Sequence, residues 1–268
     1  MIGLPFASAL AAAVLSTSFL SGIFGMTGGM ILMGILLVMM PLAAAMVLHG
    51  LTQMASNGWR AWLWRGHIKW PIVGYYAAGA LLAAVLFVGV RFAPSKPVAL
   101  IALGVTSLVG LLLPRQFGLD AGRRWHAFGA GAICTALQLL AGVSGPVLDV
   151  FFVGSKLDRK DTIATKAAIQ LLGHFLKVVY FAPLLVGGDE AIAPMAAVLA
   201  VTLAVVGTQL SWRVLDAISD AQFRVWTRRL IAAIAAVYLI QGLVLLVDGH
   251  RAAEAVAAPP ITSVALEP

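Results

Sequence analysis

Charged residues are scarce in this chain. Asp, Glu, Lys and Arg make up 11% of its 268 residues, and 61% of the residues are hydrophobic. Soluble domains contain about 25% charged residues, so this composition excludes an ordinary soluble domain. A chain this apolar is expected to lie in a lipid bilayer, where helices satisfy their backbone polar groups internally. The sequence therefore predicts an all-α polytopic membrane protein.

Other features that the sequence lacks exclude several classes of function. Cys134 is the only cysteine, so no intramolecular disulfide can form. The chain has no G-x-x-x-x-G-K-[S/T] motif, which argues against direct ATP drive. No Lys or Arg precedes the apolar stretch 4–20, so this stretch is expected to be a membrane helix rather than a cleaved signal peptide. No cofactor, metal or nucleic-acid partner is expected, and the net charge of +7 is expected to report membrane topology.

The clearest pattern is an internal repeat. Gly25-Met26-Thr27-Gly28-Gly29 returns 117 residues later as Gly142-Val143-Ser144-Gly145-Pro146. The same offset pairs polar residues inside two long apolar segments, namely His49, Gln53, Asn57 and Arg60 with Lys166, Gln170, His174 and Lys177. A loop match followed by four matches in register indicates an ancient duplication.

Each half is expected to contain five helical elements. The halves are 1–113 and 125–248, joined by a basic linker at 114–124, and the tail 249–268 is expected to be disordered. The expected elements are, in order, 4–20, 30–40, 43–64, 70–92, 97–113, 125–141, 147–154, 161–184, 191–211 and 229–247. The second element of each half is too short to cross a hydrocarbon core of about 30 Å. These two segments are therefore expected to be short broken helices at the Gly-rich motifs.

The odd number of elements makes the second half enter the membrane from the opposite side. The basic turns then gather on one side, at 60–69, 114–124, 156–160 and 213–229, while the acidic turn Asp189-Glu190 lies on the other. This distribution follows the positive-inside rule for two inverted repeats with both termini outside. The turn that contains Arg91 and Lys96 is the exception.

The repeated motifs form the predicted binding site. Thr27-Gly28-Gly29 and Ser144-Gly145-Pro146 are typical of helix starts, with a hydroxyl N-cap and, in the second copy, a proline in the first turn. Such ends present free backbone N–H groups and the positive end of a helix dipole, which bind anions. In transporters with inverted repeats, broken helices place these ends near the bilayer midplane. We expect an enclosed anion site between the halves.

Side chains of the long segments complete this site. At 100° per residue, the repeated polar residues of each segment fall within about 80° of one another and form one stripe. Gln and Asn can donate amide hydrogens to an oxyanion, lysine can supply charge, and histidine can take up a proton. The predicted substrate-binding residues are Thr27, Gly28, Gly29, His49, Gln53, Asn57, Ser144, Gly145, Lys166, Gln170 and His174.

A second prediction concerns proton coupling. Asp149 lies four residues after Gly145, where the first half has Leu32, so this carboxylate breaks the repeat symmetry. An acid inside a membrane segment is a candidate proton carrier. We predict that Asp149 and His174 couple transport to protons. Asp149 can equally form a structural ion pair with Lys166.

Simpler roles are open for several of these residues. Arg60 and Lys177 lie near the ends of their segments and can snorkel to the interface. Gln53 and Gln170 can bridge helices by hydrogen bonds, and the Gly motifs can serve close helix packing. A group of tryptophans is expected to form an interfacial belt, namely Trp59, Trp62, Trp64 and Trp70.

The sequence resembles the TauE/SafE family of membrane transporters, also called the sulfite exporter or TSUP family. The resemblance covers most of residues 5–247 and is carried by Ser21 to Gly29 followed by Pro41, by Arg65-Gly66-His67-Ile68, and by Asp161 to Thr165. Family members commonly have a Gly-Gly-Gly loop in each half, where this chain has Thr27-Gly28-Gly29 and Ser144-Gly145-Pro146. The resemblance implies export of small sulfur-containing anions, such as sulfite or sulfonates, across a bacterial inner membrane.

Different classes of function stay open. Gly142-Val143-Ser144-Gly145 matches the G-x-S-G pattern of rhomboid-like intramembrane proteases, with His174 as the base. The first copy, however, has Thr27 and Asn57 at the positions of Ser144 and His174, and a protease has no use for a duplicated site. A passive anion channel or a membrane scaffold is also compatible with the sequence. The oligomeric state is open, with a homodimer as one option.

Overall fold

The computed structural model describes residues 4–24, 26–112, 119–185, 192–215 and 220–257. These ranges contain α-helices and short 3-10 turns, and no strand occurs within them. The helices are α1 (Leu4–Phe24), α2 (Thr27–Met39), α3 (Leu42–Leu63), α4 (Trp70–Val90), α5 (Lys96–Leu112), α6 (Arg124–Ala141), α7 (Gly145–Val153), α8 (Arg159–Phe181), α9 (Pro194–Leu215) and α10 (Asp220–Ala257). The all-helical prediction is confirmed.

The helix order follows the predicted elements closely. Five helices, α1 to α5, precede the linker and five, α6 to α10, follow it. The last helix reaches Ala257, so the predicted disorder is wrong for 249–257; alanine and charged residues with good helix propensity continue the helix. Residues 258–268 lie outside the described ranges, as do Gly25, the linker residues 114–118 and the acidic turn Asp189-Glu190.

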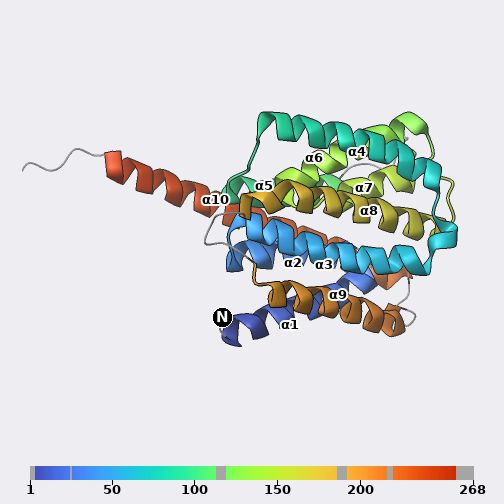
Figure 1. Ribbon diagram of the computed structural model, residues 1–268, viewed down its shortest axis with the longest axis horizontal. Coiled ribbons are helices and arrows are strands. Elements are labelled where there is room, and N and C mark those ends of the chain that lie inside the picture. The colour runs from blue at the N-terminus through green and yellow to red at the C-terminus, as the bar shows by residue number, and fades with distance from the viewer. Residues whose placement is uncertain (1–3, 25, 113–118, 186–191, 216–219, 258–268) are drawn as a thin grey trace, which may run out of the picture.

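The helices form one elongated bundle in which the two halves interleave (Figure 1). The most extensive contacts join α1 with α9, α4 with α6, α3 with α8 and α5 with α10. Each of these pairs takes one helix from each half. If each helix of the first half is exchanged for its counterpart in the second half, the pair of α1 with α9 becomes the pair of α6 with α4. The pair of α3 with α8 and the pair of α5 with α10 each map onto themselves.

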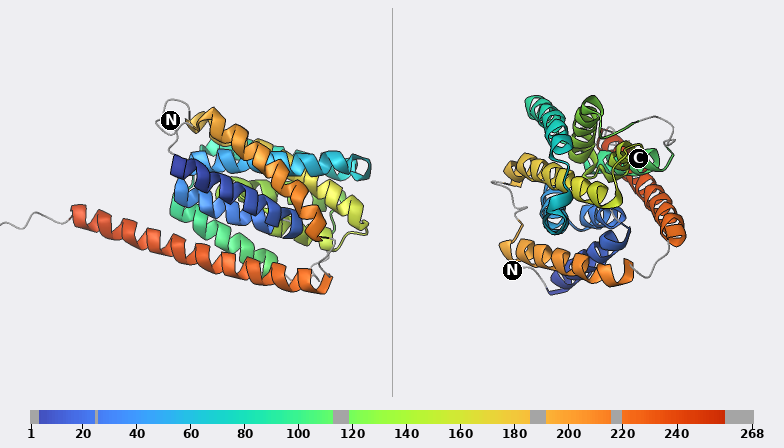
Figure 2. Two further views of the ribbon diagram at one scale, coloured as in Figure 1. Left: turned by 90° about the horizontal axis from the view of Figure 1, so that it is seen from below. Right: turned by 90° about the vertical axis from the view of Figure 1, so that its right-hand side faces the viewer.

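The α3·α8 pair lies at the centre of the bundle and is antiparallel. A Cβ on Gly58 would meet the side chain of Leu171, at 3.6 Å. At the far end of the pair, His67 in the turn after α3 contacts Asp161 in the first turn of α8. The two helices lie next to each other in Figure 1 and in the right-hand view of Figure 2. The repeated polar residues of both halves are therefore brought onto one interface.

Close approaches between the other helices depend on glycine. In the α4·α6 pair, a Cβ on Gly79 would overlap the Phe128 carbonyl, and one on Gly131 would overlap the Tyr76 carbonyl. Small residues of this kind let membrane helices approach backbone to backbone. The outer faces are apolar: Val85 on α4 is 67% exposed and Ile240 on α10 is 63% exposed.

Several helices have the properties of membrane spans. Among the described residues, five helices are long and apolar enough to cross a bilayer, and α2 and α5 are shorter apolar helices. Exposed tryptophans lie where α3 ends and where α4 and α6 begin, namely Trp62, Trp70 and Trp125. The Arg65 guanidinium lies over the Trp62 ring and that of Arg124 over the Trp125 ring. This arrangement fits an interfacial belt.

Candidate functional site

The short helices α2 and α7 begin at the same place in the bundle. Met26 precedes α2, and its side chain lies where a Cβ on Gly145, the first residue of α7, would be. The predicted helix starts are confirmed, and Pro146 occupies the first turn of α7. Ser144 occupies the predicted N-cap position of α7 whereas Met26, not Thr27, is the N-cap of α2, and neither hydroxyl makes the predicted capping hydrogen bond. The Thr27 hydroxyl donates to the Phe24 carbonyl instead, and the Ser144 hydroxyl donates to a side chain of α6.

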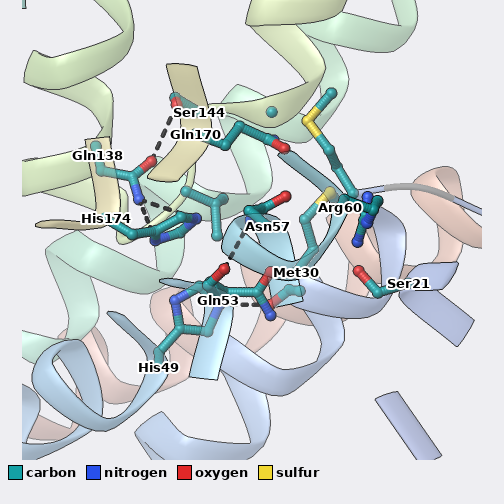
Figure 3. Close-up of a pocket in the computed structure, with 14 residues that line it drawn as sticks. Ser21, Met30, His49, Gln53, Asn57, Arg60, Gln138, Ser144, Gln170 and His174 are labelled. Atoms are coloured by element: carbon teal, nitrogen blue, oxygen red, sulfur yellow. Dashed lines mark hydrogen bonds between the residues drawn. The ribbon is translucent and has the colours of Figure 1, made fainter. Parts of the chain in front are cut away.

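A cavity lies between these two helix starts and the centres of α3 and α8 (Figure 3). The space that the centre of a water molecule can occupy in this cavity is about 20 Å³. The cavity therefore has room for roughly one water molecule. The lining residues are Ser21, Met26, Gly29, Met30, His49, Gln53, Asn57, Arg60, Gln138, Val143, Ser144, Gly145, Gln170 and His174. None of these is Asp or Glu.

Many of the residues that line the cavity occupy equivalent positions in the two halves of the sequence. Four pairs of residues that are 117 positions apart line the same cavity, namely Ser21 and Gln138, Met26 and Val143, Gln53 and Gln170, and Asn57 and His174. Three of these pairs are polar in both halves. The cavity is thus built from both halves, and each half contributes equivalent positions.

A chain of hydrogen bonds runs through the second half of the lining. The Ser144 hydroxyl donates to Gln138 Oε1 at 3.0 Å, and Gln138 Nε2 lies 2.7 Å from His174 Nδ1. An amide nitrogen can only donate, so His174 Nδ1 is the acceptor and its Nε2 is the protonated nitrogen of a neutral ring. Figure 3 shows these three side chains on one side of the cavity.

A second network lies beside His49. His49 Nε2 is 2.8 Å from the Gly29 carbonyl oxygen, and His49 Nδ1 is 2.7 Å from Lys177 Nζ. Lys177 Nζ also donates to the Gly142 carbonyl at 2.9 Å. Lys177 is fully buried, so the interpretation that its amine snorkels to the interface is wrong. This network ties the two Gly-rich motifs together through α3 and α8.

Arg60 provides a permanent positive charge in the lining. Its Nη2 donates to the Ser56 hydroxyl at 3.2 Å, while its Nε is buried without a hydrogen-bond partner. In the described part of the chain, no carboxylate lies within salt-bridge distance of Arg60. The Arg60 side chain is partly exposed as a whole, but its buried Nε has unused hydrogen-bonding capacity beside the cavity.

The structure places most, but not all, of the predicted binding residues at the cavity. Those that line it are Gly29, His49, Gln53, Asn57, Ser144, Gly145, Gln170 and His174. Thr27 and Gly28 are buried behind it, and a Cβ on Gly28 would overlap the Thr17 carbonyl of α1. Gly28 therefore serves close helix packing, which is the simpler role for a glycine of this motif.

Lys166 and Asp149 lie outside the lining. The Lys166 amine donates to the Asp149 carboxylate, and the Asp149 side chain is 48% exposed. The structural ion pair is therefore present. Asp149 and His174 are not partners, because His174 contacts Gln138 and lies beside His49.

Three polar lining residues, Ser21, Arg60 and Gln138, were not predicted as binding residues. Ser21 and Gln138 precede the Gly-rich motifs, and they are 117 residues apart. Extending the repeat register backwards from the motifs would have identified both, since each is a polar residue in an apolar helix.

The geometry does not form the Ser–His pair of a protease. Gln138 lies between Ser144 and His174 and hydrogen-bonds to both. An amide cannot take the serine proton, so the direct hydrogen bond that activates a nucleophile is missing between these two residues.

The family described as "Sulfite exporter TauE/SafE" matches residues 9–239, which include every residue of the cavity. No curated protein and no solved structure matches the chain. The match covers most of the sequence and agrees with the resemblance carried by its motifs. The chain is therefore a multi-pass membrane protein of the sulfite exporter TauE/SafE family.

Proposed function

We propose that this chain is a secondary transporter that exports small sulfur-containing anions, such as sulfite or sulfonates, across the bacterial inner membrane. The family assignment supports anion export. The observation that carries the proposal is the lining of the cavity, which contains the Arg60 guanidinium and several amide side chains but no Asp or Glu. A buried site of this composition favours an anion over a cation or a neutral solute.

Backbone groups add to this preference. Gly29 and Gly145, in the first turns of α2 and α7, both line the cavity. The first N–H groups of a helix have no acceptor within the helix, and the helix dipole places partial positive charge there. Two helix starts that face one cavity suit an oxyanion, and Gln53 and Gln170 can donate to the same oxygens.

We further propose that the halves are inverted repeats that work by alternating access. Three observations support this interpretation: the offset of 117 residues, the helix pairing that is unchanged when the halves are exchanged, and the antiparallel α3·α8 pair. The cavity has room for roughly one water molecule. Side chains or helices must therefore move before an anion of several heavy atoms can bind and leave.

The charges suggest an orientation. In Figure 1, α3 ends and α4 and α8 begin at the right-hand end of the bundle, while α1 begins and α10 ends at the left. Basic residues gather at the right-hand end, among them Arg65, Lys69 and Lys160. By the positive-inside rule this end faces the cytoplasm, and both termini face outside.

The first test is binding of anions to the purified protein. A ligand that binds only the folded state stabilises it by RT ln(1 + [L]/Kd), so thermal unfolding is measured with sulfite, thiosulfate, sulfoacetate, taurine, carboxylates and chloride. We expect stabilisation by sulfur oxyanions that is lost in Gln53→Ala and Gln170→Ala. The matched control is Gln209→Ala, because Gln209 lies outside the lining.

Transport in liposomes distinguishes a carrier from a channel or a scaffold. An alternating-access carrier loaded with unlabelled anion accelerates uptake of labelled anion, whereas a passive channel shows no such counterflow and a scaffold shows no flux. Absence of stabilisation by every anion would contradict the proposed site.

A further inference from the structure

The His49–Lys177 pair is the most unusual feature of the bundle interior. Both side chains are fully buried, where the first half of α3 packs against the last turns of α8. In the described residues, no carboxylate lies within salt-bridge distance of the Lys177 amine. An ammonium buried in this way without a counter-ion is strongly disfavoured. The charge on this pair must therefore depend on what occupies the space beside it.

The hydrogen bonds of the His49–Lys177 pair match a neutral imidazole and a neutral amine. The Gly29 carbonyl can only accept, so His49 Nε2 carries a proton and donates at 2.8 Å. His49 Nδ1 of a neutral ring then accepts from Lys177 Nζ, which also donates to the Gly142 carbonyl. A neutral amine has two hydrogens, and these two bonds use both of them. The neutral pair satisfies all three contacts, and one added proton leaves an N–H and a positive charge without a partner among them.

The groups that face the pair from the neighbouring elements cannot compensate that charge. From α8, His174 faces the pair, with its ring 5.4 Å from that of His49. The α2 and α6 sides present the carbonyls of Gly29 and Gly142. Arg60 on α3 is a further cation at the same cavity. The carboxylates Asp149 and Asp161 are paired elsewhere.

We propose that His49 and Lys177 form one proton-binding site, which is neutral while the cavity is empty and takes up a proton from water when an anion occupies the cavity. The proton adds to the lone pair of Lys177 Nζ, and the anion beside His49 compensates the new charge. This inference rests on the proposed function, because it requires an anion in the cavity. It locates proton coupling between the first half of α3 and the last turns of α8 rather than at Asp149.

The proposed coupling between anion binding and proton binding makes the affinity for the anion increase as the pH falls. The anion-bound protein holds more protons than the empty protein, so lowering the pH favours anion binding, and anion binding favours proton uptake to the same extent. Within the pH range in which the pair changes its charge, the affinity is expected to fall up to tenfold for each unit of pH increase. A monovalent anion and its proton would then move together without net charge.

Proton uptake on binding tests the inference directly. Sulfite is added to the detergent-purified protein in weakly buffered solution with a pH-indicator dye, and the titration of sulfite itself is subtracted with a protein-free sample. We expect up to one proton taken up per bound sulfite by the unmodified protein. The uptake per bound anion is expected to vanish in Lys177→Met and in His49→Gln. The matched control Lys160→Met is expected to keep it, since Lys160 lies at the start of the same helix over the Trp64 ring.

The possible outcomes separate this inference from the proposed function. Sulfite binding by the unmodified protein without proton uptake would overturn the inference and leave the anion site standing, and this result needs no variant to fold. Proton uptake that persists in Lys177→Met but is lost in Asp149→Asn would also overturn it. A complete absence of binding by sulfite and by every other sulfur oxyanion tested would overturn the proposed function, and the inference with it.

Discussion

Arg60→Gln is the sharpest test of the anion site. A hydrogen bond to a charged group contributes about 1.5–3 kcal/mol, which corresponds to a roughly 10- to 150-fold loss of affinity at about 1.4 kcal/mol per factor of ten. At an anion concentration about 100 times the original Kd, stabilisation by the ligand is about 2.7 kcal/mol, and it falls to about 0.4 kcal/mol when the Kd rises about 100-fold. The measurement is a series of unfolding curves at increasing sulfite concentration.

The ligand-free protein should behave differently under the same substitution. Arg60 donates a long side-chain hydrogen bond to Ser56, at 3.2 Å, and its buried Nε has no partner. Removing an unsatisfied buried donor relieves a penalty of about 1–3 kcal/mol, so Arg60→Gln is expected to unfold at the same temperature as the original chain or higher. A site that sacrifices stability for binding gives these opposite effects.

Two comparison variants make the result interpretable. Arg60→Lys keeps the charge but loses the planar fork, so we expect an intermediate affinity. Arg65→Gln removes an exposed arginine that lies over the Trp62 ring, and we expect no change in affinity. If Arg60→Gln bound sulfite within about threefold of the original Kd, Arg60 would not contact the anion and the reasoning from the cavity lining would be refuted.

Three further predictions concern other parts of the fold. The unmodified protein should not react with a fluorophosphonate probe, because the Ser144 hydroxyl donates to an amide; labelling that Ser144→Ala abolishes would instead support a protease. Gly131→Val should lower stability by about 1–3 kcal/mol because its Cβ would overlap a carbonyl of α4. Gly129→Val, on the same helix with open space around it, should not, and equal melting temperatures would contradict the packing argument. Asp161→Asn removes ion pairs to two half-exposed basic residues and should cost no more than about 1 kcal/mol for each pair, as measured by thermal unfolding at low and high salt.

Much of the fold could be predicted because membrane helices leave a direct trace in the sequence. The apolar segments and the prolines and glycines between them indicate helix positions that the structure matches within a few residues for most elements. The end of α10 could not be predicted in this way, because helix propensity alone extends a charged, alanine-rich segment beyond the membrane. Its helix continues to Ala257.

The site was predictable in position and less so in detail. The repeat register located the cavity, since Gln53 and Gln170 occupy equivalent positions and both line it. The sequence could not show that Gly28 packs against α1 while Gly29 faces the cavity, because adjacent residues on a helix point about 100° apart. It also could not show that the Thr27 and Ser144 hydroxyls bond elsewhere than to their helix starts.

The repeat makes the differences between its halves informative. Arg60 and Lys177 are equivalent by the offset of 117 residues, yet Arg60 lines the cavity while the Lys177 amine is held by His49 and the Gly142 carbonyl. Arginine stays charged in any environment, whereas lysine can lose its proton when buried. A permanent cation therefore lines the cavity, and a residue that can be neutralised lies next to it. The double variant Arg60→Lys with Lys177→Arg exchanges these two residues. If both positions served only to hold an anion, this variant would bind the anion with the same pH dependence as the original chain. Our assignment requires that the pH dependence be lost, because arginine at position 177 cannot release its proton.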